Sequence, residues 1–186
     1  MKRCSWVNEG NPLYISYHDE EWGHPLYDDQ KLYELLCMES YQAGLSWEIV
    51  LNKREDFRES FYHYDLYKVA LMSDNELDSL LENPKIIRHK LKLYATRANA
   101  KAVLMIREQF GSFSNYLWSY IGGQTIVNSV KDYRERPSQT ALSQRLSNDL
   151  KKRGFKFLGP VAVYSFLQAS GMINDHEDDC FLKNNI

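Results

Sequence analysis

Residues 143–170 read SQRLSNDLKKRGFKFLGPVAVYSFLQAS, a pattern typical of two helices joined by a short turn. Gly154 ends the first helix, and Gly159 immediately precedes the second. Pro160 then occupies a first-turn position, where proline is tolerated. The first helix is marked by leucines at helical spacing: Leu142, Leu146 and Leu150. This stretch therefore predicts a helix, a hairpin turn and a second, apolar helix.

The turn also offers a place for a DNA phosphate. Backbone N–H groups beside Gly159 are unpaired and lie at the positive end of the second helix dipole. The net charge of −2 argues against binding by bulk positive charge, so any contact with DNA requires such a local patch. The candidate contacts are the two glycines and nearby cations: Gly154, Gly159, Lys152, Arg153 and Lys156. The alternative is that these cations only stabilise the C-terminal end of their own helix.

Apolar periodicity and capping signals predict further helices before this stretch. We expect them at residues 28–40 (capped by Asp28 or Asp29), 46–61, 73–83 (with a Ser73–Glu76 capping box) and 113–121 (capped by Ser112). A long helix over 88–110 is expected to pack through Leu91, Ala95, Ala98, Ala102 and Met105. The two helices of the hairpin motif are expected to begin at Pro137-Ser138 and at Pro160, the second ending at Ser170. Residues 124–137 have no such signal and read as an irregular loop, so the predicted fold is all-α.

Composition places the chain among ordinary globular proteins. It has 186 residues, 44% hydrophobic and 26% charged, which suits one folding unit over residues 1–186. The start MKRCSWVNEG lacks the apolar core of a signal peptide, and no apolar run is long enough to span a bilayer. We therefore expect a soluble, cytoplasmic protein. Its three cysteines are too few and too scattered for a disulfide framework.

Four residues with metal-ligand chemistry lie near the two ends of the chain: Cys4, His18, His176 and Cys180. The last two are separated by three residues, a spacing that lets both face one metal ion. A Cys₂His₂ set closes a tetrahedral zinc site with no open position, which indicates a structural role that ties residues 1–20 to residues 174–182. The alternative is that the cysteines are small core residues and the histidines are unrelated.

Glu39 continues the apolar stripe of the 28–40 helix, where a carboxylate requires a partner or must be neutral. A functional role and a frayed helix end that turns Glu39 to water both remain open. The surroundings favour function, because aromatic and amide side chains lie close in sequence: Tyr14, Tyr17, Trp22, Gln42 and Trp47. Such residues together suit a flat, cationic ring, held by cation–π attraction and charge pairing.

Five ordered motifs carry a family resemblance: RCSWV (3–7), YHDEEWG (17–23), LCMESYQAGLSW (36–47), LKKRGFKFLGP (150–160) and SFLQASGMINDH (165–176). Together they resemble the 3-methyladenine DNA glycosylase I family, a branch of the helix-hairpin-helix DNA glycosylases. The resemblance spans essentially the whole chain. It implies that residues 143–170 form the helix-hairpin-helix motif and that the activity is excision of 3-methyladenine from alkylated DNA in base-excision repair.

The resemblance also implies roles for individual residues. One structural zinc ion per chain would be held by Cys4, His18, His176 and Cys180, and the base pocket would include Glu39, Tyr17, Trp22 and Trp47, with Tyr14 and Gln42 beside them. We see no equivalent of the catalytic aspartate that follows the hairpin elsewhere in the superfamily; Asp175 suits a place behind the metal ligands better. No lysine stands out as a Schiff-base nucleophile, so we expect a monofunctional enzyme without lyase activity. The expected partner is double-stranded alkylated DNA, bound by a monomer without a nucleotide cofactor.

Two other functions remain open. A zinc-stabilised DNA-binding module would need the hairpin and the metal but no chemistry at Glu39. A glycosylase for another alkylated purine, such as 7-methylguanine, would present a carbonyl where adenine has its amine. Release of a base, and the identity of that base, discriminate between these possibilities.

Overall fold

The computed structural model describes residues 1–186 and is built almost entirely from helices. The α-helices are α1 (Pro12–Glu20), α2 (Asp29–Gln42), α3 (Trp47–Asn52), α4 (Arg54–Ser60), α5 (Leu66–Leu71), α6 (Asp74–Ser79), α7 (Lys90–Phe110), α8 (Phe113–Ser119), α9 (Ala141–Lys152) and α10 (Pro160–Ala169). Three 3₁₀ turns, η1 (Tyr62–Tyr64), η2 (Leu80–Glu82) and η3 (Tyr133–Glu135), and two short strands, β1 (Ile126–Val127) and β2 (Ile173–Asn174), complete the fold. The predicted helical class is confirmed.

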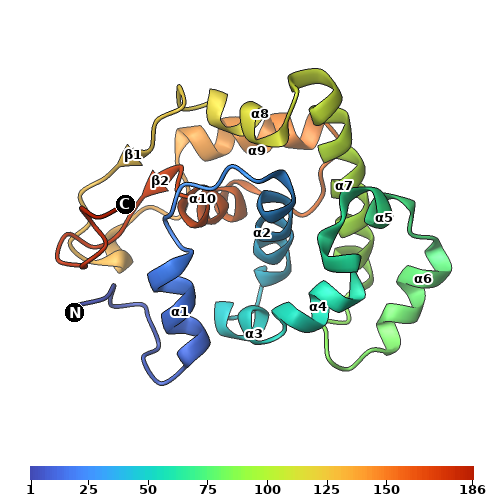
Figure 1. The fold of residues 1–186 in the computed structure, drawn as a ribbon, viewed down its shortest axis with the longest axis horizontal. Helices are drawn as coiled ribbons and strands as arrows, with labels where there is room; N and C mark the ends of the chain where they lie inside the picture. Colours follow the sequence, from blue (N-terminus) through green and yellow to red (C-terminus); the bar gives the residue numbers. More distant parts are fainter.

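Helix α2 lies at the centre of the molecule. Every residue from Leu32 to Tyr41 is buried, because other elements pack against the helix on several sides. Figure 1 shows α10 on one side of α2 and α7 on the other, and α2 contacts both of them as well as α3 and α8. One continuous hydrophobic cluster of 43 buried residues results. The end of α2 is thereby held in place by its packing against neighbouring helices.

Several helix boundaries form as the capping signals predict. Asp28 accepts from the Lys31 N–H at the start of α2, and Ser73 makes a reciprocal capping box with Glu76 at α6. Ser112 caps α8, and Gly159 precedes α10 with Pro160 in its first turn. Gly154 follows α9 with a φ of +95°, the left-handed conformation that glycine adopts most readily.

Other predictions about the helices are wrong. The expected helix over 46–61 is two helices, broken at Lys53, where ψ is near 0°. Helix α9 begins at Ala141 rather than at Pro137-Ser138, because Thr140 and Ser143 form the capping box there. Leu91 and Met105 of α7 are exposed, whereas Ala95 and Ala102 are buried, since the face against the core runs through Leu93, Thr96, Val103 and Ile106. Helices α1 and α5 were not expected.

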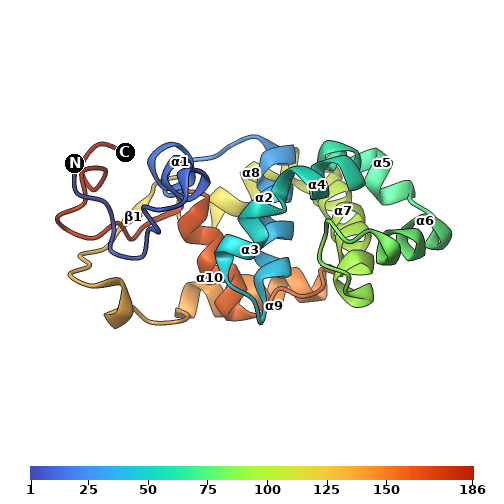
Figure 2. The same ribbon diagram turned by 90° about the horizontal axis from the view of Figure 1, so that it is seen from below.

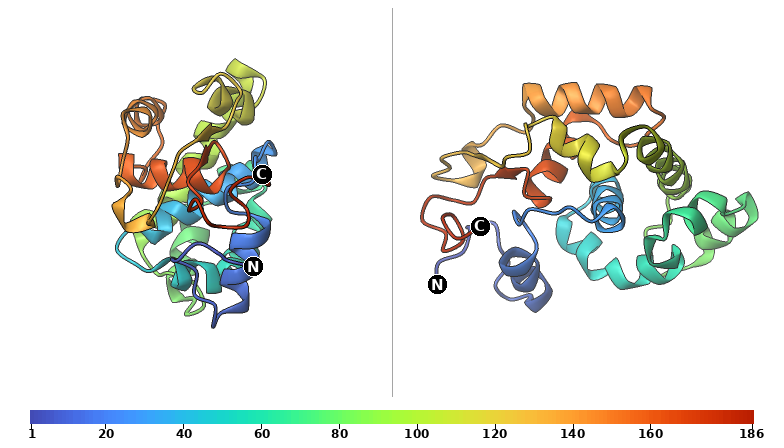
Figure 3. Two further views of the ribbon diagram at one scale, coloured as in Figure 1. Left: turned by 90° about the vertical axis from the view of Figure 1, so that its left-hand side faces the viewer. Right: turned by 45° about the horizontal axis from the view of Figure 1, so that its top comes forward.

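The two ends of the chain lie at the same end of the molecule (Figures 1 and 2). The view of Figure 3 that faces this end places both termini toward the viewer. The strands lie nearby: β1, in the segment expected to be irregular, pairs in parallel with β2 just before the C-terminal residues. Glu177 is a junction for three segments, since its carboxylate accepts from Ser5 N–H, Ser5 Oγ and Tyr133 N–H, at 2.7, 2.6 and 2.9 Å. No helix has the length and apolarity needed to cross a membrane.

Candidate active site and metal centre

A cavity of about 270 Å³ opens between α1, α2, α3, α10 and the segment before α9; we call it the aromatic cavity. All six residues expected at a base pocket line it: Tyr14, Tyr17, Trp22, Glu39, Gln42 and Trp47. The remaining lining residues are Trp6, Tyr133, Arg136, Ser165 and Gln168. Flat rings therefore form much of its wall, and Glu39 and Arg136 are its only charged side chains.

Glu39 is a buried carboxylate in the last turns of α2. Its residue is 4% exposed, so the alternative in which it turns to water is wrong. It accepts no hydrogen bond from the protein, and it lines the aromatic cavity. Burial raises the pKa of Glu39 to about 8, and the positive charge of Arg136 acts in the opposite direction. An unpaired buried carboxyl of this kind is suited to a ligand that brings a positive charge or a hydrogen-bond donor.

Aromatic side chains surround this carboxyl group. The ring centroids of Tyr17 and Trp47 lie 5.1 Å apart with an interplanar angle of 43°. The indole N–H of Trp47 is buried without a hydrogen-bond acceptor, which leaves a second unpaired polar group at the cavity. Gln42 donates its side-chain amide to Leu45 O at 3.1 Å and thereby shapes the loop between α2 and α3. The cavity thus combines flat apolar walls with a few unsatisfied polar groups, as ligand sites commonly do.

Five cavity residues were not predicted from the sequence. Tyr133 and Arg136 come from the segment expected to be an irregular loop, where no periodic pattern reveals which side chains face inward. Ser165 and Gln168 lie three residues apart on α10, an otherwise apolar helix, and two polar residues on one face of such a helix are a recognisable signal. Trp6 packs edge-on against Trp22, with ring centroids 4.9 Å apart.

The predicted metal ligands come together. One ligand atom from each of Cys4, His18, His176 and Cys180 lies within 4.8 Å of the others, and all four residues are buried. We call this group the terminal cluster. The Nδ1 atom of His18 is 2.7 Å from Asp19 Oδ1, and that of His176 is 3.1 Å from Asn174 Oδ1. These contacts direct both Nε2 atoms to the cluster.

The donors of the terminal cluster fit a zinc ion. The Nε2 atom of His176 is buried and has no hydrogen-bond partner, which is costly unless another ligand occupies that direction. Burial also lowers the pKa of His176 to about 3, so the ring is neutral and keeps a lone pair for a metal. Two thiols and two imidazoles are the composition of closed, four-coordinate zinc sites.

Asp175 does not orient the histidines, contrary to the expectation from the sequence. Its carboxylate accepts from Tyr164 Oη, from Gln168 Nε2 at 2.5 Å and from Asn128 Nδ2 at 2.7 Å. The groups behind the histidines are instead Asp19 and Asn174. Asp175 therefore supports α10 and the aromatic cavity, through Gln168.

The terminal cluster and the aromatic cavity share a wall. Trp22 lines the cavity and packs edge-on against His176, with ring centroids 4.5 Å apart. Gly23 follows with a φ of +83°, and a Cβ atom there would lie 2.4 Å from His176 Cε1. Only glycine lets the chain approach this ring so closely. The packing around the cluster thus fixes one side of the cavity.

Buried polar side chains of α7 and α9 hold the backbone of the hairpin, residues 154–159. Asn99 of α7 accepts from Lys156 N–H at 2.8 Å and donates to Lys156 O at 3.2 Å. Ser147 of α9 donates to Leu158 O at 2.6 Å. Lys152, Gly154, Lys156 and Gly159 are exposed, so their backbone and side chains face solvent.

Arg153 differs from the other predicted DNA contacts. Its guanidinium donates to Asp149 at 2.8 Å and to Gln109 at 2.7 Å, and it lies over the rings of Phe110 and Tyr116. These contacts hold α9 against α7 and α8. Arg153 is therefore already occupied within the fold, whereas Lys152 and Lys156 have no ion pair.

A family model described as methyladenine glycosylase matches residues 6–183 of the chain. The chain belongs to the methyladenine glycosylase family. A DNA-3-methyladenine glycosylase of Haemophilus influenzae is 47% identical over 96% of both chains. DNA-3-methyladenine glycosylase 1 of Escherichia coli is 45% identical over 97% of this chain and 96% of its own.

Solved structures agree with this methyladenine glycosylase assignment. The crystal structure of a single-residue variant of 3-methyladenine DNA glycosylase I, in complex with 3-methyladenine, superposes with a TM-score of 0.94. That protein shares 42% of its sequence with this chain, and the match covers 98% of each. The fold of this chain is therefore that of 3-methyladenine DNA glycosylase I.

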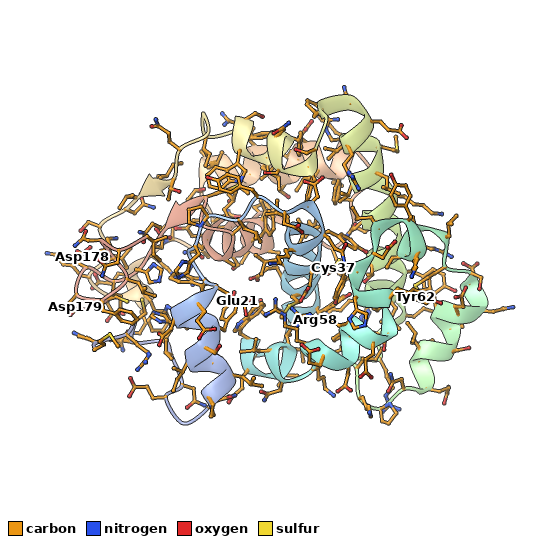
Figure 4. The ribbon with its side chains drawn as sticks, in the orientation of Figure 1. Glu21, Cys37, Arg58, Tyr62, Asp178 and Asp179 are labelled. Atoms are coloured by element: carbon orange, nitrogen blue, oxygen red, sulfur yellow. The ribbon has the colours of Figure 1, made fainter.

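This methyladenine glycosylase also has a larger hollow, of about 700 Å³, on the other side of Tyr17. Half of its lining residues are charged, among them Glu21, just after α1, and Arg58 of α4, both labelled in Figure 4. Arg54 donates to Glu21 and to Glu34, and Arg58 donates to Glu34, so these charges already pair with one another. The smaller aromatic cavity, whose carboxyl group is unpaired, is the better candidate for the active site.

Proposed function

We propose that this chain is a monofunctional DNA glycosylase that excises 3-methyladenine from alkylated double-stranded DNA. One observation carries the proposal: a buried carboxyl group, without a protein partner, lies in a cavity walled by aromatic rings. Membership of the methyladenine glycosylase family supports the same activity. Since the aromatic cavity and the terminal cluster are each built from one chain, we propose that a monomer is sufficient.

The cavity suits a cationic purine for electrostatic reasons. Methylation at N3 gives the adenine ring a positive charge, which a neutral purine lacks. Glu39 would accept a hydrogen bond from the exocyclic amine and, once ionised, balance the charge of the ring. Tyr17 and Trp47 would stack on or border the ring after the nucleotide is flipped out of the helix. Normal adenine gains none of the charge pairing and is held less strongly.

The reaction itself needs little assistance. Attack of water at C1′ forms a C–O bond while the bond from C1′ to the base breaks. The bonding electron pair goes to the base, which leaves neutral because it was cationic, and the water loses a proton. No lysine lines the aromatic cavity, so no amine is placed to form a Schiff base with the sugar, and we propose that no strand cleavage follows.

We also propose that residues 143–170 act as a helix-hairpin-helix that holds the duplex. Backbone N–H groups at the start of α10, together with Lys152 and Lys156, would contact phosphates on either side of the flipped nucleotide. The exposed hairpin and its rigid support by Asn99 favour this role. A local patch of this kind is consistent with a net charge of −2.

For the terminal cluster we propose one structural zinc ion, held by Cys4, His18, His176 and Cys180. The unpaired Nε2 atom of His176 supports this assignment. A zinc ion with four protein ligands has no open position, so it would stabilise the two ends of the chain and take no part in the chemistry.

The activity is tested by incubating the protein with methylated DNA and identifying the released base. Glu39→Gln keeps the shape of the side chain but removes its charge, and we expect excision to fall about 10- to 100-fold, the cost of a charge-assisted hydrogen bond. Glu59→Gln, an exposed change on α4, is the control and should leave the rate unchanged. Equal rates for Glu39→Gln and wild type would contradict the role of this carboxyl group.

The same experiment separates the two other functions. A zinc-stabilised DNA-binding module would bind the duplex and release no base. A glycosylase for 7-methylguanine would release that base preferentially, although its carbonyl cannot donate a hydrogen bond to Glu39. Inhibition by free 3-methyladenine, and not by free 7-methylguanine, is the outcome that the geometry of Glu39 predicts.

A further inference from the structure

Arg136 is a cation inside a cavity that is proposed to take a cationic ring. Of the eleven residues lining the aromatic cavity, only Arg136 and Glu39 are charged. A positive charge at this place opposes the entry of a positively charged base unless an anion balances it. The proposed binding of a cationic base therefore does not by itself account for a positive charge at this position.

The side chain of Arg136 is held in place by a buried relay. Its Nη1 atom donates to Gln168 Oε1 at 2.8 Å. The amide nitrogen of Gln168 donates to Asp175, so the amide oxygen is forced to point toward the arginine. Tyr164 also donates to Asp175, and its ring lies 5.9 Å from the guanidinium carbon of Arg136. Gln168 and Asp175 are each 2% exposed, so this support is rigid.

The backbone that carries Arg136 is fixed as well. Tyr133, at the start of η3, donates its N–H to Glu177 at 2.9 Å. Asp132 caps the same turn by accepting from Arg134 N–H at 2.9 Å. Arg136 follows directly after this turn, so both its backbone and its side chain are placed at the rim of the cavity.

The groups that face Glu39 leave Arg136 as its only counter-charge. Helix α1 contributes the phenols of Tyr14 and Tyr17, and the segment before α9 contributes Tyr133 and Arg136. Helices α3 and α10 contribute only uncharged side chains: Trp47, Ser165 and Gln168. The phenols are neutral near pH 7, and burial raises the pKa of Tyr14 and of Tyr17 further. Burial alone would keep Glu39 protonated, and Arg136 is the one group that favours its carboxylate form.

We propose that Arg136 is a positioning residue that favours the carboxylate form of Glu39, so that a larger fraction of the empty cavities presents an anion to an incoming cationic ring. The inference rests on the proposed function for its biological meaning, but the coupling between the two residues is a property of the free protein. Arg136 acts through Glu39 and need not touch the base. Its attachment to Gln168 holds it in the lining of the cavity.

The coupling is measured on the free protein by ¹³C NMR of the glutamate carboxyl carbons as a function of pH. The Glu39 signal is assigned by its absence in Glu39→Gln. In Arg136→Met the midpoint of the Glu39 titration should rise by about one pH unit, the usual effect of losing a nearby opposite charge. Arg136→Lys should restore most of the shift. Lys131→Met, which removes an exposed charge from the same segment, is the control and should leave the midpoint unchanged.

Excision from methylated DNA supplies the second readout. We expect Arg136→Met to lose activity about tenfold near pH 7 and to recover as the pH rises, because Glu39 then ionises without help. A midpoint that is the same in Arg136→Met and in wild type overturns the proposal. A loss of excision that is equal at every pH and that varies with salt overturns it too, and assigns Arg136 to a DNA phosphate instead.

If the wild-type chain releases no 3-methyladenine, the proposed function is wrong, whatever the NMR titration gives. If wild type releases the base but the midpoint of the Glu39 titration is the same in Arg136→Met and in wild type, only the positioning role is wrong.

Discussion

The proposed chemistry of the aromatic cavity depends on Glu39, a side chain whose burial lowers the stability of the folded protein. Glu39 is part of the most buried helix, where a neutral residue of the same size would be favoured. Its polar end nevertheless opens into a cavity with no protein partner. Residues that reduce stability in this way are commonly retained for binding or catalysis.

This cost predicts a pH dependence of stability. The pKa of Glu39 in the folded protein is about 8, above its ordinary value of 4.5. Between these pH values the folded protein keeps a proton on Glu39 that the unfolded chain releases. The contribution of Glu39 to the free energy of unfolding therefore falls as pH rises through this window and is constant above it. We expect wild type to lose stability relative to Glu39→Gln between pH 5 and pH 8, by at most about 5 kcal/mol. Urea denaturation of both proteins at the two pH values measures the difference, and parallel curves would contradict it.

Among the cavity residues, sequence reasoning identified those of α1, α2 and α3 and Trp22, and it missed Trp6, the segment before α9 and the two residues of α10. Glu39 could be singled out because it interrupts an apolar stripe of regular period. Arg136 could not, because it lies in a segment without periodicity, where the inward side chain is decided by tertiary contacts with Gln168 and Glu177. The intramolecular contacts of Arg153 could be predicted only in part, since Asp149 lies four residues earlier on α9, a helical spacing, whereas Gln109 of α7 is a tertiary contact.

At the scale of single elements, the end of α2 is held by a neighbour. Lys92 of α7 is 5% exposed, and its Nζ donates to Tyr41 O and to Ala43 O, both at 2.8 Å. A lysine amine is a good partner for the unpaired carbonyls at a helix C-terminus. The turn of α2 that carries Glu39 and Gln42 is thereby fixed against α7.

Replacing this lysine should therefore weaken both fold and function. Lys92→Met leaves two carbonyls without their donor, and we expect a loss of about 1–3 kcal/mol in the free energy of unfolding. Excision should fall as well, because Glu39 and Gln42 lose their fixed position. Lys101→Met, an exposed change on the same helix, is the control for denaturation and activity. If the two variants behave alike, the role given to Lys92 is wrong.

The hairpin depends on α7 in a similar way. Asn99 satisfies both backbone groups of Lys156 and is fully buried. In Asn99→Leu the hairpin loses this support, and we expect affinity for undamaged duplex DNA to fall about tenfold, or ~1.4 kcal/mol, at fixed salt. Asn75→Leu, an exposed change on α6, is the matched control. Unchanged DNA affinity in Asn99→Leu would argue against the hairpin as a DNA contact.

Elements that combine a start signal with a clear apolar pattern could be predicted, and those without a clear pattern could not. Helices α2, α6, α8 and α10 carry side-chain caps or a first-turn proline, and their starts were predicted within one or two residues. Helix α1 also has a side-chain cap, Asn11, and a first-turn proline, but its apolar pattern is weak, because its inward face carries Tyr17 and His18 for the cavity and the terminal cluster. At the break at Lys53 the neighbours change, since α3 contacts α1 and α2 whereas α4 contacts η1, and periodicity does not report such contacts.

For the molecule as a whole, the terminal cluster joins residues that are far apart along the chain. If it holds zinc, purified protein should contain about one zinc ion per chain, and a chelator should lower its melting temperature. Cys180→Ala should lose the metal and much of the stability. Cys37→Ala also removes a buried thiol, from the centre of α2, and should keep the zinc. Elemental analysis of both variants decides; equal metal content would exclude the proposed ligand set.

The junction at Glu177 bears on the order in which the protein is made. The wall of the cavity that carries Tyr133 and Arg136 leaves the ribosome well before Glu177, the acceptor for Tyr133 N–H. Every helix of the fold can therefore be synthesised while this wall still lacks its anchor. A nascent chain that stops after α10 would have all the helices that line the cavity, but Tyr133 and Arg136 would not yet be held in place. The complete cavity would form only when the last residues are translated.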